Sequence, residues 1–427
     1  MLSQAAPPLG PGTKLALGMY TCLWYACLPF GLCIPRLRSS LWPRLRTSLE
    51  PRETDIWIQA ASAGECRLTQ TLIQSWSDTR PLSFLATTNT PQGMQVLHSI
   101  QTPRNMLFTP AYAPLDTGPA VRSALAARRP KMVVLMETEL WPNLLAACRQ
   151  FDIPVLLINA RMTCKSFSRY SLLPGLCQTL APDRILCVSS WDARRYSALF
   201  GKGRVETMNN MKFDRWADVQ EPLPYVHNPL SSLFKAQSQF AVYGSVRREE
   251  ESILLEAITR ISRMHPRAIQ AVFPRHMHRV QAWMDALKQA GLKAVLRSHI
   301  QGNALQGTVV LWDRMGELEP AYALARAVFV GGSLAPKGGQ NFLESLAQGV
   351  IPCIGPWWSN FAWVGSDILK QGLITQITDV DDLVLAMSQS LRSPPPRNKV
   401  FQRFQDFVHQ RQGGVHQAQT SITHFLK

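Results

Sequence analysis

Short apolar runs alternate with amphipathic stretches along most of the chain after residue 50. Each run ends in small or polar residues, which is typical of parallel strands that helices cover on both faces. The first series comprises 55–60, 82–88, 131–136, 153–160 and 184–190. The second series comprises 240–245, 269–274, 308–313, 327–332 and 350–355. The pattern predicts an α/β fold, with functional loops after the carboxyl ends of the strands.

A polar, proline-bearing stretch separates the two series and predicts two doubly wound, Rossmann-like domains. We expect the first domain over 51–215, a linker over 216–236 and the second domain over 237–395. A proline-rich segment ends the second series. The amphipathic remainder, 396–427, predicts one or two C-terminal helices.

The N-terminal 50 residues have the features of a membrane anchor. Leu15 to Pro35 carries no charged residue, and the run is about as long as the ~20 residues that cross a bilayer core. Pro29 and two glycines leave open a helix that lies in the membrane interface, or one that docks on protein. No small-residue cleavage site follows, but four arginines do: Arg36, Arg38, Arg44 and Arg46. We expect an uncleaved anchor whose arginines attract anionic lipid, with the rest of the protein in the cytoplasm.

The composition is strongly basic, with 45 Lys and Arg against 29 Asp and Glu and a net charge of +16. Such a surface attracts anions, but charge alone does not distinguish nucleic acid, anionic lipid and a phosphorylated substrate. The basic residues are dispersed and aromatic-spaced RNA motifs are missing, so we expect no nucleic-acid partner. The nine cysteines include no C-x-x-C pair, a pattern that indicates reduced surroundings and neither a disulfide framework nor a zinc ribbon.

The segment ASAGE (61–65) follows a predicted strand and opens a helical stretch. Ser62 and Gly64 at such a turn leave backbone N–H groups available for an anion or a sugar oxygen. Glu65 then has two interpretations. It is either the acidic residue that a helix dipole favours in its first turn, or a general base at the mouth of an interdomain cleft.

The segment ETELWPN (137–143) directly follows the buried strand KMVVLM. An α/β fold presents catalytic and binding groups at this end of a strand, so Glu137 and Glu139 are candidates for either role. Both carboxylates also have a purely structural interpretation as caps of the next helix, for which Pro142 suits the first turn.

Glycine-rich and basic segments recur at strand ends of the second series, in 244–251, 274–280 and 330–349. This placement is typical of phosphate binding by helix N-termini and by Arg or Lys side chains. Neither a dinucleotide fingerprint nor a P-loop is present. His276 and His278 lack acidic or Cys neighbours in the sequence, so we predict no metal site.

Together these segments resemble the family of 3-deoxy-D-manno-octulosonic acid (Kdo) transferases, inverting glycosyltransferases of lipopolysaccharide assembly. The matching segments, in the family's order, are ASAGE, ETELWPN, NARM (159–162) with Ser166 and Tyr170, MKFD (211–214), PRHMHR (274–279), MGELEPAYALARAVFVGGS (315–333), GGQNFLE (338–344) and GPWWSNF (355–361). The resemblance implies a GT-B fold, two Rossmann-like domains facing a cleft. It also implies CMP-Kdo as donor, a lipid A precursor (lipid IVA) as acceptor on the cytoplasmic face of the inner membrane, and no metal or cofactor.

By this resemblance Glu65 is the general base, and Glu137 and Glu139 are acceptor-side or supporting carboxylates. The residues that the resemblance assigns to substrate and nucleotide binding are Ser62, Gly64, Lys212, Ser245, Arg247, Arg275, His276, Gly316, Glu317, Gly332, Ser333, Asn341 and Glu344. A donor with a phosphate and a carboxylate needs cations and N–H donors, and an incoming hydroxyl needs a base.

The chain departs from the family pattern at three places. Val246 and Arg247 stand where G-S-T-H is usual, Gln340 stands where G-G-H-N has its histidine, and Asn210 stands where a glycine usually precedes MKFD. These changes affect residues expected to contact the donor. Arg247 is the residue that would replace the lost positive charge.

Two other functions compete with Kdo transfer. One is a related GT-B enzyme, or an epimerase, that uses another nucleotide sugar. The other is an inactive, membrane-bound lipopolysaccharide-binding protein, which the altered donor residues suggest. Glu65, Arg275 and Glu344 are all present, which favours an active transferase.

Overall fold

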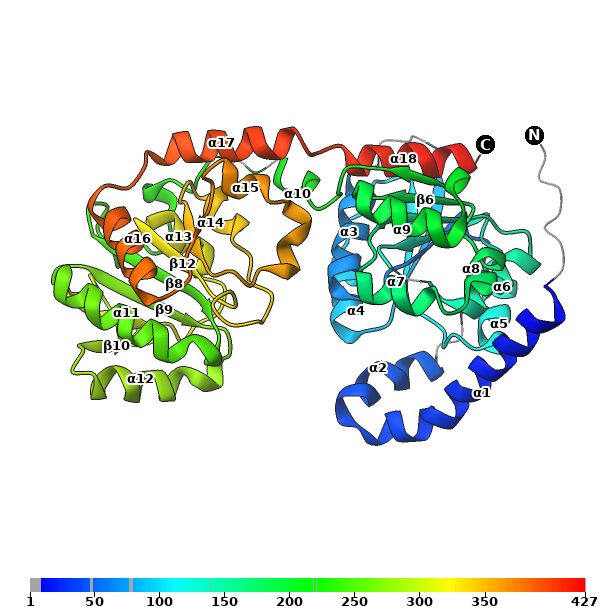
Figure 1. The fold of residues 1–427 in the computed structure, drawn as a ribbon, viewed down its shortest axis with the longest axis horizontal. Coiled ribbons are helices and arrows are strands. Elements are labelled where there is room, and N and C mark those ends of the chain that lie inside the picture. Colours follow the sequence, from blue (N-terminus) through cyan, green and yellow to red (C-terminus); the bar gives the residue numbers. More distant parts are fainter. Residues whose placement is uncertain are drawn as a thin grey trace. The chain divides into compact units, whose positions relative to one another are not determined.

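The structure, a computed structural model, describes residues 9–46, 49–76, 80–138, 140–217, 219 and 221–426. The chain forms two compact units (Figure 1). The first contains Met1–Arg215 together with Arg411–Lys427, and the second contains Trp216–Gln410.

The first unit is a seven-stranded parallel sheet with helices on both faces (Figure 1). Its strands are β1 (Ile56–Gln59), β2 (Leu82–Thr88), β3 (Met106–Tyr112), β4 (Met132–Met136), β5 (Val155–Ala160), β6 (Arg184–Cys187) and β7 (Val205–Thr207). They lie in the order β3-β2-β1-β4-β5-β6-β7. The strand order therefore reverses between β1 and β4, which is where open α/β sheets bind their ligands.

Both faces of this sheet are buried. Successive strand residues point to opposite sides, so one strand can contribute to both apolar clusters. Trp57 of β1 packs in one apolar cluster, and Ile56 and Ile58 pack in the other. The covering helices are α3 (Ala63–Gln74), α4 (Pro91–His98), α5 (Gly118–Arg128), α6 (Pro142–Gln150), α7 (Cys164–Tyr170), α8 (Pro174–Thr179), α9 (Ser190–Phe200) and α18 (Gly414–Phe425). The apolar runs predicted as strands are confirmed, and both of their faces are covered.

The second unit repeats the plan with a parallel sheet in the order β10-β11-β9-β8-β12-β13-β14. Its strands are β8 (Phe240–Val246), β9 (Ile269–Pro274), β10 (Ala294–Leu296), β11 (Val309–Leu311), β12 (Ala327–Val330), β13 (Pro352–Ile354) and β14 (Thr375–Gln376). Its helices are α11 (Glu251–Met264), α12 (Val280–Gln289), α13 (Leu318–Leu324), α14 (Leu343–Ala347), α15 (Asp367–Lys370), α16 (Val380–Arg392) and α17 (Arg397–His409). Here the order reverses between β8 and β12.

The chain passes between the units twice, at α10 (Asp214–Ala217) and again after α17. The stretch 216–236, predicted as a linker, packs within the second unit, where Phe234 stacks on Phe240 with ring centroids 4.4 Å apart. The predicted C-terminal segment divides, since α17 belongs to the second unit and α18 to the first. The Gln419 side chain of α18 donates to the Ser75 carbonyl at 3.0 Å.

Two further helices, α1 (Pro11–Cys33) and α2 (Pro35–Arg46), precede the first sheet. Within the described part of the chain, α1 is the helix whose length and apolar composition would allow it to cross a bilayer. Figure 1 shows the two helices as a hairpin beside α5.

Candidate active site

The reversal point of the first sheet carries the two acidic motifs. The chain leaves β1 through residues 60–62 into α3, and it leaves β4 at Glu137. Because β1 and β4 are parallel neighbours, both exits lie at the same edge of the sheet. Sequence segments more than seventy residues apart are thus brought to one place.

Glu65 lies in the first turn of α3, and its carboxylate is held in place. It accepts hydrogen bonds from the Ala61 N–H at 2.7 Å and from the Ser62 hydroxyl at 2.8 Å. Ser62 is the N-cap of α3 and accepts the Glu65 N–H at 3.4 Å. These contacts are those of a helix cap, the structural interpretation of Glu65. Gly64, beside Glu65 in the chain, is exposed.

Burial also makes Glu65 a stronger base than an ordinary glutamate. Desolvation raises the pKa of its carboxyl group, the negative charge of Glu137 raises it further, and the hydrogen bond from Ser62 opposes the shift. A capped carboxylate with a raised pKa can both orient a hydroxyl and take its proton.

Glu137 is buried and surrounded by cations. Its φ of 54° turns the chain sharply at the end of β4. One carboxylate oxygen lies 2.6 Å from the Lys212 Nζ, and the other lies 3.6 Å from an Arg161 guanidinium nitrogen. The Asn159 amide lies 3.5 Å from the same carboxylate. Glu137 is therefore a carboxylate paired with two cations, whereas the Glu65 carboxylate is held by hydrogen bonds from Ala61 and Ser62.

The Lys212 loop is braced by two asparagines. The Met211 N–H donates to the Asn159 side-chain oxygen at 2.9 Å, and the Lys212 N–H donates to the Asn210 side-chain oxygen at 3.0 Å. Asn210 does not have a positive φ. The glycine that the family pattern has here is therefore not required by the backbone, and the asparagine side chain adds a hydrogen bond. Glu139, the other predicted carboxylate of this motif, lies outside the described residues.

Replacing Lys212 by methionine is expected to lower the free energy of unfolding by about 1–3 kcal/mol, because a buried charged acceptor loses its donor. Urea denaturation measures the loss, with exposed Lys165→Met as the matched control. Adding Glu137→Gln should restore part of the loss, since the two groups are coupled. Equal stability of the Lys212 and Lys165 variants would contradict the pairing.

The reversal point of the second sheet carries the glycine-rich motifs. Ser245 at the end of β8 has a φ of 55°, and Gly332 after β12 has a φ of 73°. A Cβ on Gly331 would lie 2.7 Å from the Ser245 carbonyl oxygen, so only glycine allows the two loops to approach this closely.

Glu250 connects these two loops through hydrogen bonds to their backbone N–H groups. Its side chain is 0% exposed. Its carboxylate accepts the N–H groups of Gly332 at 2.7 Å, Ser333 at 2.9 Å and Leu334 at 2.9 Å. It also accepts the Arg247 N–H at 3.1 Å. Glu250 cannot be recognised from the sequence, because within RREEE it is indistinguishable from a solvated surface charge.

These bonds bear on the predicted donor contacts of Gly332 and Ser333. Both N–H groups are engaged by Glu250, and the Ser333 hydroxyl donates to the Val330 carbonyl and accepts from the Gly355 N–H. Ser333 is also buried. A direct donor contact through these atoms would require an existing bond to open.

Arg247, Arg275 and His276 form a cationic rim at the same edge, after β8 and β9. An Arg247 guanidinium nitrogen lies 3.5 Å from the His276 Nε2, and the His276 ring stacks on His278 with centroids 5.6 Å apart. Desolvation, followed by the charges of Arg247 and Arg275, lowers the pKa of His276. Such a cluster favours a bound anion, which would relieve the repulsion among the cations.

The remaining predicted binding residues are held by neighbours within the second unit. The Asn341 amide donates to a Glu344 carboxylate oxygen at 2.7 Å. Glu317 follows Gly316, whose φ is 84°, and it accepts from Arg297 at 3.0 Å and from the Trp312 indole at 2.8 Å. No group of three or more His, Cys, Asp or Glu side chains suited to a metal ion occurs among the described residues.

A family model described as 3-deoxy-D-manno-octulosonic-acid transferase (Kdo transferase) matches residues 38–215. The 3-deoxy-D-manno-octulosonic acid transferase of Haemophilus influenzae is 29% identical over 89% of this chain and 92% of its own. The enzyme of the same name from Bordetella pertussis is 31% identical over 81% of this chain and 82% of its own.

A solved glycosyltransferase from Rickettsia africae superposes with a TM-score of 0.56, covering 89% of this chain and 100% of its own. The two are 8% identical in sequence, so this likeness concerns the fold alone.

Proposed function

The chain belongs to the family of 3-deoxy-D-manno-octulosonic acid transferases, and we propose that it transfers Kdo from CMP-Kdo to a lipid A precursor, lipid IVA, with inversion at the anomeric carbon. Its fold is GT-B, with two Rossmann-like units. The observation that carries the proposal is the Glu65 carboxylate at the reversal point of the first sheet, capped in place and made more basic by burial.

In the proposed reaction Glu65 takes the proton of an acceptor hydroxyl. The freed oxygen attacks the anomeric carbon of Kdo, the bond from that carbon to the phosphate oxygen breaks, and CMP leaves with the electron pair. Glu137 is already paired with Lys212 and Arg161. We assign it the role of holding these two cations beside the acceptor, whose phosphates they can bind.

Donor recognition is assigned to the second unit. Arg247 and Arg275 supply positive charge for the phosphate and the carboxylate of CMP-Kdo, and the His276 ring beside Arg247 can add a hydrogen bond. Gly332 and Ser333 shape the loop above Glu250. The Arg247 and Arg275 side chains can stabilise the departing CMP, so the reaction as we propose it requires neither a metal ion nor a cofactor.

The acceptor is a lipid, and we propose that the enzyme works on the cytoplasmic face of the inner membrane, attached through α1 and α2. Support comes from the apolar length of α1 and from the basic α2. Nucleic acid has no part in the proposal.

A transfer assay with CMP-Kdo and lipid IVA, read by mass spectrometry, tests the function. The expected product is lipid IVA carrying Kdo. Transfer from another nucleotide sugar alone would favour a changed donor preference, as the departures at Arg247 and Gln340 suggest. Binding of lipid IVA without transfer from any donor would favour the lipopolysaccharide-binding alternative.

Replacing Arg275 by alanine should weaken CMP binding by several-fold to about 10²-fold, because a charge-assisted hydrogen bond contributes about 1.5–3 kcal/mol. Titration calorimetry with CMP measures the change. Arg267→Ala is the matched control, since Arg267 is also exposed but precedes β9 at the opposite edge of the sheet. Unchanged affinity in the Arg275 variant would remove this residue from the donor site.

A further inference from the structure

The two N-terminal helices form a closely packed hairpin. The chain turns at Ile34, and α2 returns along α1 (Figure 1). The two helices contact each other near the turn at Gly31, where an added Cβ would lie 2.7 Å from a methyl carbon of Leu41. A larger residue at position 31 would therefore require the Leu41 side chain to move.

The middle of α1 is bound to the first unit by polar contacts. The Thr21 hydroxyl accepts a hydrogen bond from the Asn143 amide at 3.2 Å, and the Tyr20 hydroxyl is hydrogen-bonded to the Asp116 carboxylate. Asp116 also accepts the N–H groups of Asn143 and Leu144 at the start of α6. We call these two contacts, of Tyr20 and Thr21, the latch.

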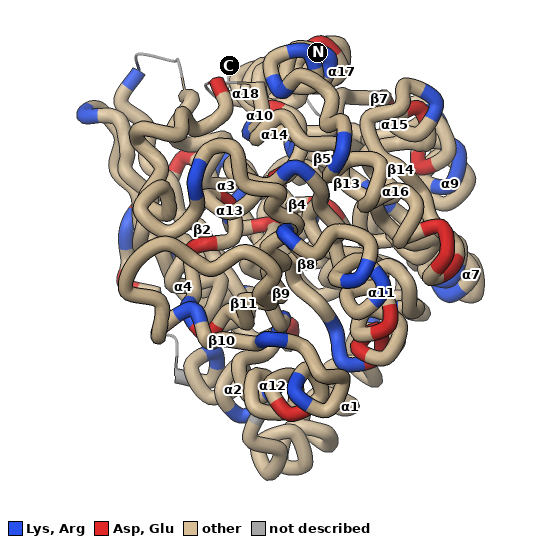
Figure 2. Tube along the Cα trace, turned by 90° about the vertical axis from the view of Figure 1, so that its left-hand side faces the viewer, with Lys and Arg blue, Asp and Glu red and all other residues tan. Residues whose placement is uncertain are grey.

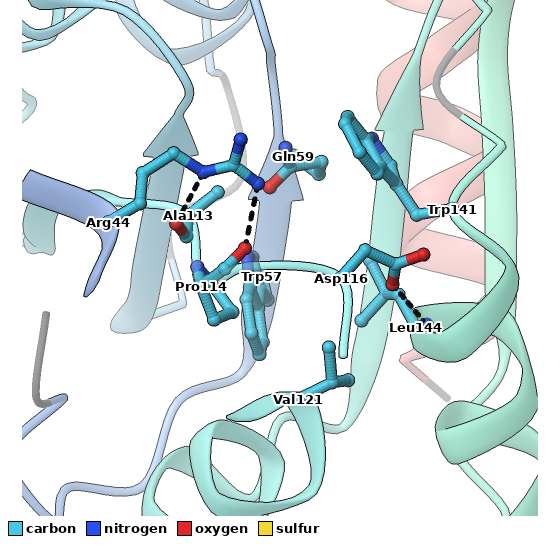
Figure 3. Close-up of a pocket in the computed structure, with 9 residues that line it drawn as sticks. All are labelled: Arg44, Trp57, Gln59, Ala113, Pro114, Asp116, Val121, Trp141 and Leu144. Atoms are coloured by element: carbon cyan, nitrogen blue, oxygen red, sulfur yellow. Dashed lines mark hydrogen bonds between the residues drawn. The ribbon is translucent and has the colours of Figure 1, made fainter. Parts of the chain in front are cut away.

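Arg44 fastens the returning helix at the same place. Its guanidinium donates to the carbonyl oxygens of Ala113 and Pro114 at 3.1 and 3.0 Å (Figure 3). It lies between the rings of Trp24 and Trp141, 5.9 and 5.6 Å from their centroids. The prediction that Arg44 attracts anionic lipid is therefore wrong. The side chain is 7% exposed and is engaged within the protein.

The latch leaves too little helix on either side to cross a bilayer. Cys22 to Cys33 extends about 18 Å and Pro11 to Met19 about 14 Å, at roughly 1.5 Å per residue. A hydrocarbon core is about 30 Å thick. Asp116 and Asn143 belong to the folded unit, so Tyr20 and Thr21 cannot lie in the middle of the bilayer while the latch is closed.

The face of α1 opposite the latch is apolar and exposed. Leu15 is 68% exposed and Phe30 is 75% exposed, and Met19 and Leu23 lie on the same side. Neither helix contains an acidic residue, and Lys14 is the one charge of α1. Most of the trace at the end of the molecule that carries the labels α1 and α2 is uncharged (Figure 2). Exposed Arg38 and Trp42 follow on α2. An apolar face bordered by cations and aromatic rings matches an anionic lipid surface.

We propose that α1 and α2 form a monotopic hairpin that enters one leaflet of the bilayer and returns, with the latch holding it on the first unit. Both ends of the hairpin then lie on the side of the catalytic units. The choice of a bilayer as partner rests on the proposed function, whereas the latch rests on the contacts alone.

Cysteine labelling in membrane vesicles tests this topology in the full-length protein. The exposed Cys22, Cys27, Cys33 and Cys164 are replaced by alanine, and the five buried cysteines stay. Single cysteines are then introduced as Gly12→Cys, before the latch, or Arg38→Cys, after the turn. A parallel sample that keeps native Cys164 reports the side of the first unit.

With a membrane-impermeant maleimide, both introduced cysteines and Cys164 should be labelled at least several-fold more in inverted inner-membrane vesicles than in intact spheroplasts. Labelling of the two introduced positions from opposite faces, or of neither in either preparation, would overturn the hairpin. Urea denaturation confirms that each variant is folded.

The latch has its own test. In the Gly12→Cys background, Tyr20→Phe with Thr21→Val makes α1 more apolar but removes its polar contacts, and Met19→Leu is the matched change on the exposed face. The double variant should label several-fold less selectively by side than the control. Identical labelling would overturn the role of the latch. If the wild-type protein showed the expected labelling pattern but no Kdo transfer, this would count against the proposed function and not against the hairpin.

Discussion

Glu65→Gln is expected to lower the kcat of Kdo transfer by roughly 10²-fold or more, the usual contribution of a positioned general base. Glutamine has the same shape and can still accept the Ala61 N–H, so the fold should persist. Steady-state assays with CMP-Kdo and lipid IVA measure the change. The matched control is Glu53→Gln, an exposed glutamate that precedes β1 at the opposite edge of the sheet.

The pH dependence gives a second measurement of the same residue. The base works only when ionised, so kcat should fall as the pH drops through the pKa of Glu65. Burial and the charge of Glu137 raise that pKa, which places the acidic limb above the ordinary range for glutamate. Wild-type turnover in a folded Gln variant, with an unchanged acidic limb, would remove Glu65 from this role.

The raised pKa has a defined effect on stability. A carboxyl group that holds its proton more tightly in the folded state stabilises the fold below its unfolded pKa, and this stabilisation is lost as the pH rises through the folded pKa. Ionised Glu65 therefore adds no electrostatic stability at neutral pH. Glu65→Gln should lose activity there without losing stability from this source.

Glu250→Gln is expected to weaken CMP binding by about tenfold or more and to lower the free energy of unfolding by about 2–3 kcal/mol. Each carboxylate oxygen accepts two backbone N–H groups. An amide would direct its own NH₂ group at two of these donors, and hydrogen bonds to a charged group are worth about 1.5–3 kcal/mol. Calorimetric titration with CMP and urea denaturation measure the two effects.

Glu249→Gln is the matched control for Glu250, because Glu249 is adjacent in sequence but exposed and paired with Lys337 at 2.8 Å. The control should remain close to wild type, since a surface ion pair contributes little. If both variants bound CMP equally well, the hydrogen bonds from Gly332, Ser333 and Leu334 to Glu250 would not contribute to CMP binding.

The strands that the sequence predicts are those buried on both faces. β3 was not predicted, because it is an edge strand that is only partly buried and contains Pro110. β14 was not predicted either, since it is short and exposed. Such strands have no continuous apolar run, so their pairing depends on neighbours that the local sequence does not reveal.

The same limit applies to the candidate site. Glu65 and Glu137 are identifiable from their positions after strands, but the partner of Glu137 is Lys212, 75 residues further along the chain. The role of Arg44 was predicted wrongly, and Glu250 was missed, for a related reason. Each lies in a charged segment typical of solvent-exposed surface, and only the tertiary fold places a carbonyl pair or a set of N–H groups around it.

The late position of α18 determines the order in which the protein can be assembled during synthesis. Val415, Ala418 and Ile422 fill the core on one face of the first sheet, yet they leave the ribosome only after the whole second unit. The second unit is continuous in sequence and can fold while this face is still open. The first unit is completed only once α18 has emerged, by which time the N-terminal hairpin has long been free of the ribosome and able to reach a membrane.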